Sequence, residues 1–149
     1  MRARNVVLWL VISSALAVGL VGWAGGVAGA SSLPLHLAFD KTLASTDPLT
    51  WTGTVSGDIE GDLTTVLLAI EEAGPVGLVE FDWIVDAGPL SFTARLIGIL
   101  NNETGGVVMD GTVVKGFLEG ARVHEEGQLV DPATLRFQGS IQIMPATAR

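Results

Sequence analysis

The chain has 149 residues, no cysteine and a formal net charge of −8. The absence of cysteine excludes a disulfide framework, a thiolate nucleophile and a zinc–thiolate site. An acidic surface repels phosphate backbones, so nucleic acid is not an expected partner. The length suits one domain that closes its own hydrophobic core.

Residues 1–30 have the features of an export signal and are set aside before the fold is considered. Arg2 and Arg4 form a positively charged start, and a long apolar stretch follows them. Ala28 and Ala30 form the small-x-small pattern that signal peptidase accepts, which predicts cleavage after Ala30. We therefore predict a secreted protein with a single domain over residues 31–149.

The same N-terminal segment could instead remain as a membrane anchor. The stretch 5–24 has about the length, some twenty residues, that a bilayer-spanning helix needs. An uncleaved anchor would contact the membrane through residues 6–24 and keep the two arginines in the cytoplasm. In both cases residues 31–149 would lie outside the cytoplasmic membrane.

The remaining sequence consists of short apolar stretches with a period of two and shows no sustained helical spacing. The first expected strand, at 33–39, is the weakest. The clearest is 50–62, in which Trp51, Val55 and Ile59 would share one face. Further strands are expected, in chain order, at 63–70, 79–86, 90–100, 106–114, 121–129 and 133–143.

Two of these stretches, 63–70 and 90–100, are apolar on both faces in places. Strands of this kind are typically covered on both sides. A second copy of the chain could supply the covering, so a homo-oligomer is one of the expected states.

Clusters of glycine, proline, asparagine and aspartate separate the expected strands. They occur at 60–62, 73–75, 88–89, 101–102, 110–111, 126–127 and 131–132. These intervals leave no room for crossover helices, so neighbouring strands should be antiparallel. We predict an all-β fold, a single antiparallel barrel of about eight strands, because glycines permit the tight bends and close approaches of a small barrel. A β-sandwich is the alternative.

Two motifs near the C-terminus carry a family resemblance, and the stretch 52–59 looks like the first long strand of the same family. The motif positions are Gly116, Phe117, Gly120 and Ala121 in a turn, and Phe137, Gly139 and Ile141 in the closing strand. The chain resembles small secreted bacterial proteins whose domain is similar to the allene oxide cyclase and dirigent β-barrels. The resemblance covers much of 50–143 and implies a barrel whose lumen holds a hydrophobic molecule.

Enzymes of that superfamily place polar side chains inside the barrel to steer a cyclisation or a coupling. This chain contains no tyrosine, and no catalytic position of the family matches it residue by residue. A cyclase- or isomerase-like enzyme therefore remains an alternative. It requires at least two polar groups converging inside the barrel, and a wholly apolar lumen would exclude it.

Four residues are candidates for binding a ligand. Trp51, Phe81 and Trp83 occupy inward positions of their expected strands, where large aromatic side chains form the core and could also line a cavity. Arg95 has apolar neighbours and could hold a ligand carboxylate if it faced the lumen. An arginine that faces outward is the simpler interpretation. These residues favour non-catalytic binding of a small apolar ligand by an exported barrel, with a structural role in the cell envelope as the alternative.

No metal site and no cofactor are predicted. Asp58, Glu60 and Asp62 flank one turn, but their spacing does not follow an EF-hand loop, and a solvated hairpin explains them. His36 and His124 are far apart in the sequence, and no serine or cysteine triad motif occurs.

Overall fold

The computed structural model describes residues 33–146. The predicted export signal, its cleavage site after Ala30 and the alternative membrane anchor lie outside the described residues. Within 33–146, no helix is long and apolar enough to cross a membrane.

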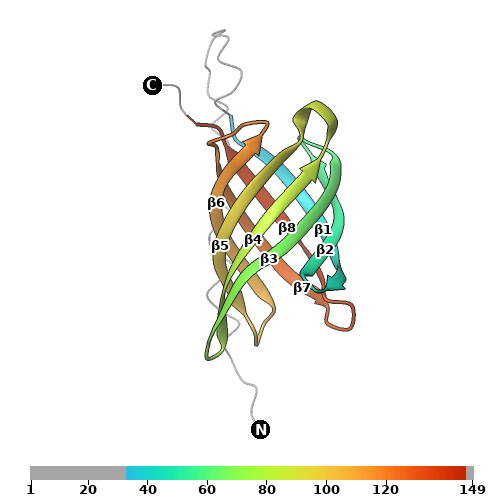
Figure 1. Ribbon diagram of the computed structural model, residues 1–149, viewed down its shortest axis with the longest axis vertical. Helices are drawn as coiled ribbons and strands as arrows, with labels where there is room; N and C mark the ends of the chain where they lie inside the picture. The colour runs from blue at the N-terminus through green and yellow to red at the C-terminus, as the bar shows by residue number, and fades with distance from the viewer. Residues whose placement is uncertain (1–32, 147–149) are drawn as a thin grey trace. The chain divides into compact units, whose positions relative to one another are not determined.

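Eight antiparallel strands form a closed barrel, in which each strand pairs with the next one along the chain and β8 returns to β1 (Figure 1). This architecture confirms the all-β barrel prediction and rules out the β-sandwich. A 3-10 turn, η1 (Gly88–Leu90), joins the fourth and fifth strands. The strands are β1 (Leu35–Thr46), β2 (Leu49–Gly57), β3 (Gly61–Ala73), β4 (Val76–Asp86), β5 (Phe92–Asn101), β6 (Gly106–Gly116), β7 (Arg122–Asp131) and β8 (Arg136–Met144).

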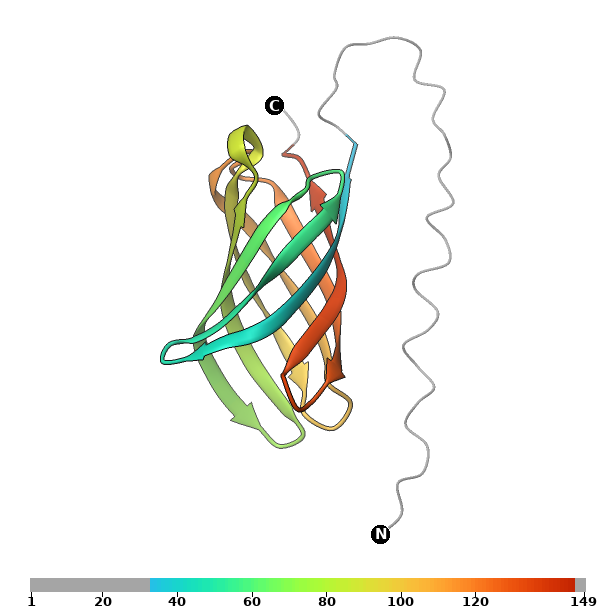
Figure 2. The same cartoon turned by 90° about the vertical axis from the view of Figure 1, so that its right-hand side faces the viewer.

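The barrel closes where β1 lies beside β8, the blue-to-teal strand and the red strand of Figure 2. The pairing runs from Leu35 opposite Ile143 to Lys41 opposite Phe137. Within residues 33–146 the sheet order leaves no strand edge unpaired, so the barrel avoids the exposed edges that promote aggregation of open sheets.

The strand limits differ most from the sequence prediction at β1 and β2, and two predicted turns lie inside strands. β1 extends to Thr46, beyond the predicted end at Phe39, and β2 ends at Gly57, with Ile59 buried in the following turn. The predicted turns at 110–111 and 126–127 are wrong, because both pairs lie inside strands β6 and β7. A Cβ atom on Gly111 would lie 1.8 Å from the Arg95 carbonyl oxygen, so this glycine permits close strand approach rather than a turn.

The lumen is filled differently towards the two ends of the barrel. At the closed end, where β1 begins and β8 ends, apolar side chains such as Leu63, Val85 and Ile143 are almost fully buried. The pocket end is the end formed by the turns at 47–48, 74–75, 102–105 and 132–135, which lies lowest in Figure 1. The buried polar side chains Lys41, Thr65 and Glu125 enter the lumen between these two ends.

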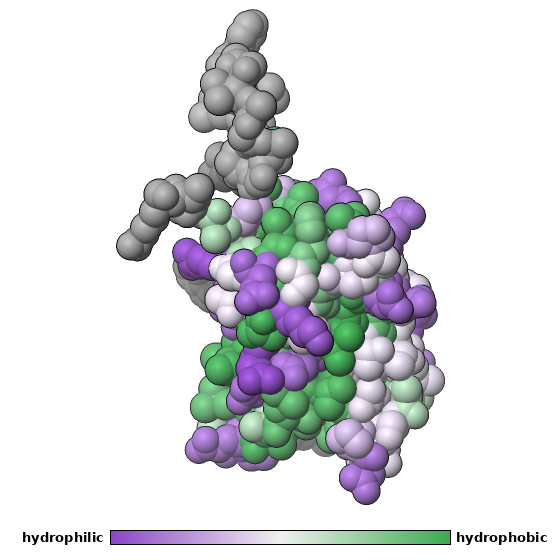
Figure 3. Space-filling view, turned by 45° about the horizontal axis from the view of Figure 1, so that its top comes forward, coloured by the Kyte–Doolittle hydropathy of each residue, from purple (hydrophilic) through white to green (hydrophobic). Residues whose placement is uncertain are grey.

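The outer face of the sheet carries exposed apolar side chains on several strands. Leu78, Ile99 and Val108 are partners in register across β4, β5 and β6, and each is more than a third exposed. Figure 3 shows apolar residues on this side of the molecule interspersed with charged ones. The two stretches that are apolar on both faces are thus uncovered in the single chain, and coverage by a second copy stays a prediction.

Candidate functional site

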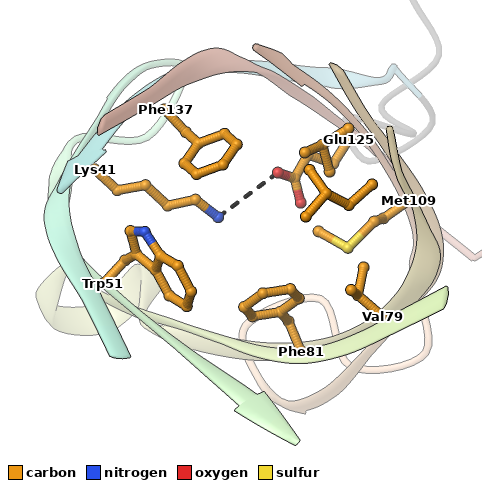
Figure 4. A pocket seen from close by; sticks show the side chains of 9 residues that line it. Lys41, Trp51, Val79, Phe81, Met109, Glu125 and Phe137 are labelled. Carbon is orange, nitrogen blue, oxygen red and sulfur yellow. Dashed lines mark ion pairs between the residues drawn. The ribbon is translucent and has the colours of Figure 1, made fainter. Parts of the chain in front are cut away.

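Two oppositely charged side chains meet inside the barrel. Lys41 follows Leu37 and Phe39 on the inward face of β1, and Glu125 follows Val123 on the inward face of β7. The Lys41 Nζ atom lies 3.7 Å from Glu125 Oε1, and the two side chains point towards each other from the two strands that flank β8 (Figure 4). Lys41 is 5% exposed and Glu125 is 1% exposed, so this ion pair is almost removed from water.

Aromatic rings surround the lysine amine. Its Nζ atom lies 4.6 Å from the ring centre of Trp83, 5.2 Å from that of Phe39 and 5.4 Å from that of Phe81. Distances below about 6 Å allow an ammonium group to interact with the ring quadrupole. Phe39 and Trp83 also pack edge to face, with their ring centres 5.0 Å apart, so these two rings form a contiguous aromatic surface.

A cavity of about 50 Å³ lies beside the ion pair, on the side of the pocket end. Its lining is aromatic and aliphatic apart from the lysine amine and the glutamate carboxylate (Figure 4). The lining residues are Lys41, Trp51, Val79, Phe81, Leu100, Val107, Met109, Glu125 and Phe137. Such a cavity offers a small apolar space in contact with two groups able to exchange protons.

Burial acts on both members of the ion pair. Desolvation lowers the pKa of Lys41 below its usual value of 10.5, although Glu125 opposes that change. Desolvation also raises the pKa of Glu125 above its usual value of 4.5, against the opposing effects of Lys41 and Trp83. The low-dielectric lumen therefore moves both groups towards their neutral forms.

Three buried polar atoms of the described residues have no hydrogen-bond partner: Thr65 Oγ1, Trp83 Nε1 and Glu125 Oε2. Thr65 and Trp83 are partners in register on β3 and β4. The indole N–H of Trp83 lies near enough to Glu125 to lower its pKa, although their geometry falls short of a hydrogen bond within the described residues. Unsatisfied buried polar atoms are unfavourable unless a bound water or ligand completes them.

The structure brings three of the four candidate ligand-binding residues together. Trp51 and Phe81 line the cavity, and their ring centres are 5.6 Å apart. Trp83 is fully buried and contacts the lysine amine. Arg95 instead lies on the outer face of β5, where its Nε atom donates a hydrogen bond to Asp82 Oδ1 at 2.9 Å.

Sequence reasoning missed the two charged residues of the lumen. Lys41 continues the alternation of Leu37 and Phe39, but the expected strand ended at Phe39, so its inward position was not considered. Glu125 continues the alternation from Val123 within the expected strand 121–129. Extending each alternation by two residues would have found both.

The histidines and acidic clusters lie elsewhere. Within residues 33–146 no group of three or more metal-ligating side chains is close enough to hold a metal ion. His124 lies on the outer face of β7, with Nδ1 2.7 Å from Asp110 and Nε2 3.2 Å from Glu126. Partial burial lowers the pKa of His124, but these two carboxylates outweigh that effect and raise it above 6.5.

No protein-family model, no curated protein and no solved structure matches the chain at a significant level. The fold is established as an eight-stranded antiparallel β-barrel, and the function has to be argued from the lumen itself.

Proposed function

We propose that this chain is an exported β-barrel protein that binds a small, partly polar molecule in the lumen. The observation that carries the proposal is the buried pair of Lys41 and Glu125 beside an apolar cavity. The apolar part of the ligand would contact Trp51 and Phe81, and its polar group would reach the lysine or the carboxylate. The resemblance to allene oxide cyclase-like and dirigent-like barrels, whose lumen holds a hydrophobic molecule, supports the same location.

The volume of the cavity limits the size of the ligand. Drug-sized ligands occupy pockets of about 300–1,000 Å³. The cavity here measures about 50 Å³, which is less than the volume of two molecules in liquid water, at about 30 Å³ each. A ligand of a few non-hydrogen atoms fits this space, and a longer one would have to extend out through the pocket end.

A purely structural role for the ion pair is the competing explanation. A buried pair can contribute to a unique packing arrangement without binding anything, but burying it commonly lowers stability relative to an apolar pair. A structural pair is expected to be fully hydrogen-bonded. Among residues 33–146, Glu125 Oε2 has no hydrogen-bond partner, and a cavity adjoins the pair, so a ligand site explains the arrangement better.

The proposal is tested by nuclear magnetic resonance of the full-length protein with labelled methyl groups. A series from ethanol to hexanol should shift the Met109 and Val107 methyl signals, with the short alcohols binding and the longest losing affinity. Val107→Leu should fill the cavity and abolish the shifts, whereas the exposed neighbour Val108→Leu should leave them unchanged. Absence of any saturable shift across the series would refute lumen binding.

An enzyme is the second candidate, and a specific observation favours it. An isomerase or cyclase needs at least two polar groups converging inside the barrel, and Lys41 and Glu125 do converge there. A carboxyl group whose pKa is raised by burial is suited to donate a proton to a bound substrate. Turnover of a small carbonyl or unsaturated substrate that Glu125→Gln abolishes would place this candidate first.

Self-association is a third candidate, favoured by the outward row of Leu78, Ile99 and Val108. A second copy of the chain could cover this row and serve a structural role in the envelope. Sedimentation velocity should then show a dimer that Ile99→Glu converts to a monomer. A monomer for the unmodified chain at all concentrations would eliminate this candidate.

A further inference from the structure

Lys41 combines the features of a nucleophilic amine rather than those of an ordinary structural lysine. Its amine lies in the interior of the barrel, against aromatic rings, and lines a cavity large enough for a few atoms. A lysine amine attacks carbonyl carbon only in its neutral form, and an apolar environment favours that form. The low-dielectric surroundings that lower the pKa of Lys41 act in the required direction.

Glu125 occupies the position of a proton donor for the same chemistry. Its Oε1 lies 3.7 Å from the amine, and its second oxygen has no partner among residues 33–146. Loss of the hydroxyl group from a carbinolamine requires a proton, and a protonated carboxyl beside the amine can supply it. After that transfer, the carboxylate remains next to the new positive charge.

We propose that Lys41 captures a small aldehyde as a covalent iminium, with Glu125 as the proton donor and then the counter-ion. The amine nitrogen adds to the carbonyl carbon, and one amine proton passes to the carbonyl oxygen to give a carbinolamine. Glu125 then protonates the hydroxyl group, which leaves as water while the nitrogen lone pair forms the carbon–nitrogen double bond. The products are the lysine iminium, water and the Glu125 carboxylate, so atoms and charges balance without any further reactant.

The pocket selects the aldehyde by size and polarity. A cavity of about 50 Å³ accepts a chain of two or three carbons, and Trp51, Phe81 and Phe137 offer it only apolar surface. The slight exposure of Lys41, Phe137 and Val107, between 5% and 9%, indicates an entry route through the pocket end. This inference rests on the proposed function, because it names the ligand class and the bond that the lumen site forms.

The sequence supplies an internal control for labelling. The chain contains two lysines, Lys41 in the lumen and Lys115 exposed at the closed end of β6. A protonated amine does not attack a carbonyl carbon, and the apolar lumen favours the neutral form of Lys41. Lys41 should therefore be labelled faster than Lys115 at neutral pH, and the advantage should shrink as the pH approaches 10.

The experiment treats the full-length protein with acetaldehyde at pH 7, reduces it with sodium cyanoborohydride and maps the ethyl adduct by peptide mass spectrometry. We expect labelling at Lys41 to be at least about tenfold faster than at Lys115, because the apolar lumen favours the neutral amine. Lys115→Arg should keep the lumen adduct, and Lys41→Arg should remove it. Equal labelling of the two lysines, or labelling of Lys115 alone, would overturn the proposal.

Glu125→Gln tests the proton donor separately. Replacing the acid by an amide should slow adduct formation about 100-fold, the range of a lost general acid. The same substitution removes the negative charge that favours protonated Lys41, so a loss of amine reactivity cannot explain the slowing. An unchanged rate in Glu125→Gln would remove Glu125 from the mechanism.

Ethanol distinguishes failure of this inference from failure of the proposed function. Ethanol has the size of acetaldehyde but no carbonyl group, so it reports lumen binding without covalent capture. If ethanol shifts the Met109 methyl signal while acetaldehyde never modifies Lys41, the lumen binds ligands and the iminium proposal is wrong. If neither event occurs, both proposals fail.

Discussion

The Trp51 indole Nε1 donates a hydrogen bond of 3.0 Å to the Leu135 carbonyl oxygen, which joins β2 to the turn between β7 and β8. Leu135 adopts a left-handed backbone conformation, with φ of 49°. The bond therefore holds an aromatic wall of the cavity against a turn of the pocket end. Residues 84 positions apart in the chain are fixed together at the site where a ligand would enter.

Trp51→Phe is expected to keep an aromatic ring in the cavity wall and to lose this hydrogen bond. A single net hydrogen bond contributes about 0.5–1.5 kcal/mol to the free energy of unfolding, and we expect a decrease of that size. Urea denaturation followed by far-ultraviolet circular dichroism measures it. An unchanged free energy of unfolding would mean that the bond adds nothing to the stability of the pocket end.

Replacing both members of the ion pair by apolar residues is expected to stabilise the protein. The double variant Lys41→Met with Glu125→Leu should gain about 1–4 kcal/mol, because it removes two desolvated charges and fills space with apolar atoms. Each single substitution should instead lose about 3–5 kcal/mol, because it leaves one buried charge without its partner. Thermal and urea unfolding of all four proteins completes the cycle, and a destabilised double variant would indicate a structural pair.

The stability of the wild type relative to that double variant should depend on pH in two windows. The pKa of Lys41 is lowered on folding. The contribution of Lys41 to the free energy of unfolding is therefore complete above pH 10.5 and is lost as the pH falls through the lowered pKa. The pKa of Glu125 is raised on folding. The contribution of Glu125 to the free energy of unfolding is therefore complete below pH 4.5 and is lost as the pH rises through the raised pKa. The wild type should therefore be relatively least stable near neutral pH, and a pH-independent difference would contradict the shifts.

Gly53→Ala is expected to destabilise the barrel wall beside Lys41. The two residues are partners in register, and a Cβ atom at position 53 would lie 1.8 Å from the Asp40 carbonyl oxygen. Since that oxygen belongs to the backbone, β1 and β2 would have to separate, at a cost of about 1–3 kcal/mol or more.

Gly77→Ala is the matched control in another strand. Its added Cβ would have no neighbour nearer than 3.8 Å, so we expect a change within about 0.5 kcal/mol. Equal effects of the two substitutions would show that loss of glycine flexibility, and not strand approach, determines the outcome.

Asp40→Asn should make the stability of the protein less sensitive to acid, because Asp40 pairs with Arg136 where β1 lies beside β8. Hydrogen bonds from Arg136 and Gln138 lower the pKa of Asp40 from 3.8 to about 2, so its contribution to stability is present above pH 3.8 and is lost as the pH falls through 2. The pair is partly exposed, which limits that contribution to about 1 kcal/mol. The difference between Asp40→Asn and the wild type should shrink between pH 5 and pH 2, and a difference that grows would be inconsistent with this ion pair.

The barrel was predictable because alternation and turn chemistry are local signals. Trp83 and Val85 on β4, and Phe137 and Ile141 on β8, face inward as their spacing predicts. Gly111 and Gly127 were wrongly predicted to lie in turns. Glycine is common both in turns and where two strands approach closely, and only the position of the neighbouring strand distinguishes these two cases. The local sequence does not contain that neighbour.

The site was less predictable than the fold. Lys41 lies beyond the expected end of its strand at Phe39, and Glu125 belongs to a class of residue that usually faces water, so the local pattern marks neither as inward. They are held inside by each other, by the ring of Phe39 on the same strand as Lys41, and by the rings of Phe81 and Trp83 on β4. A pairing across the lumen cannot be read from either strand alone.

The pairing of Leu35 with Ile143 brings the first and last strands of the barrel to the same end, side by side. The folded sheet is therefore a ring, and the order in which its strands are connected is not fixed by the ring itself. The chain could be cut at the 74–75 turn and rejoined between residues 146 and 33 by a short linker without removing any strand pair. Such a circular permutant would keep the pocket while placing new termini beside its entrance.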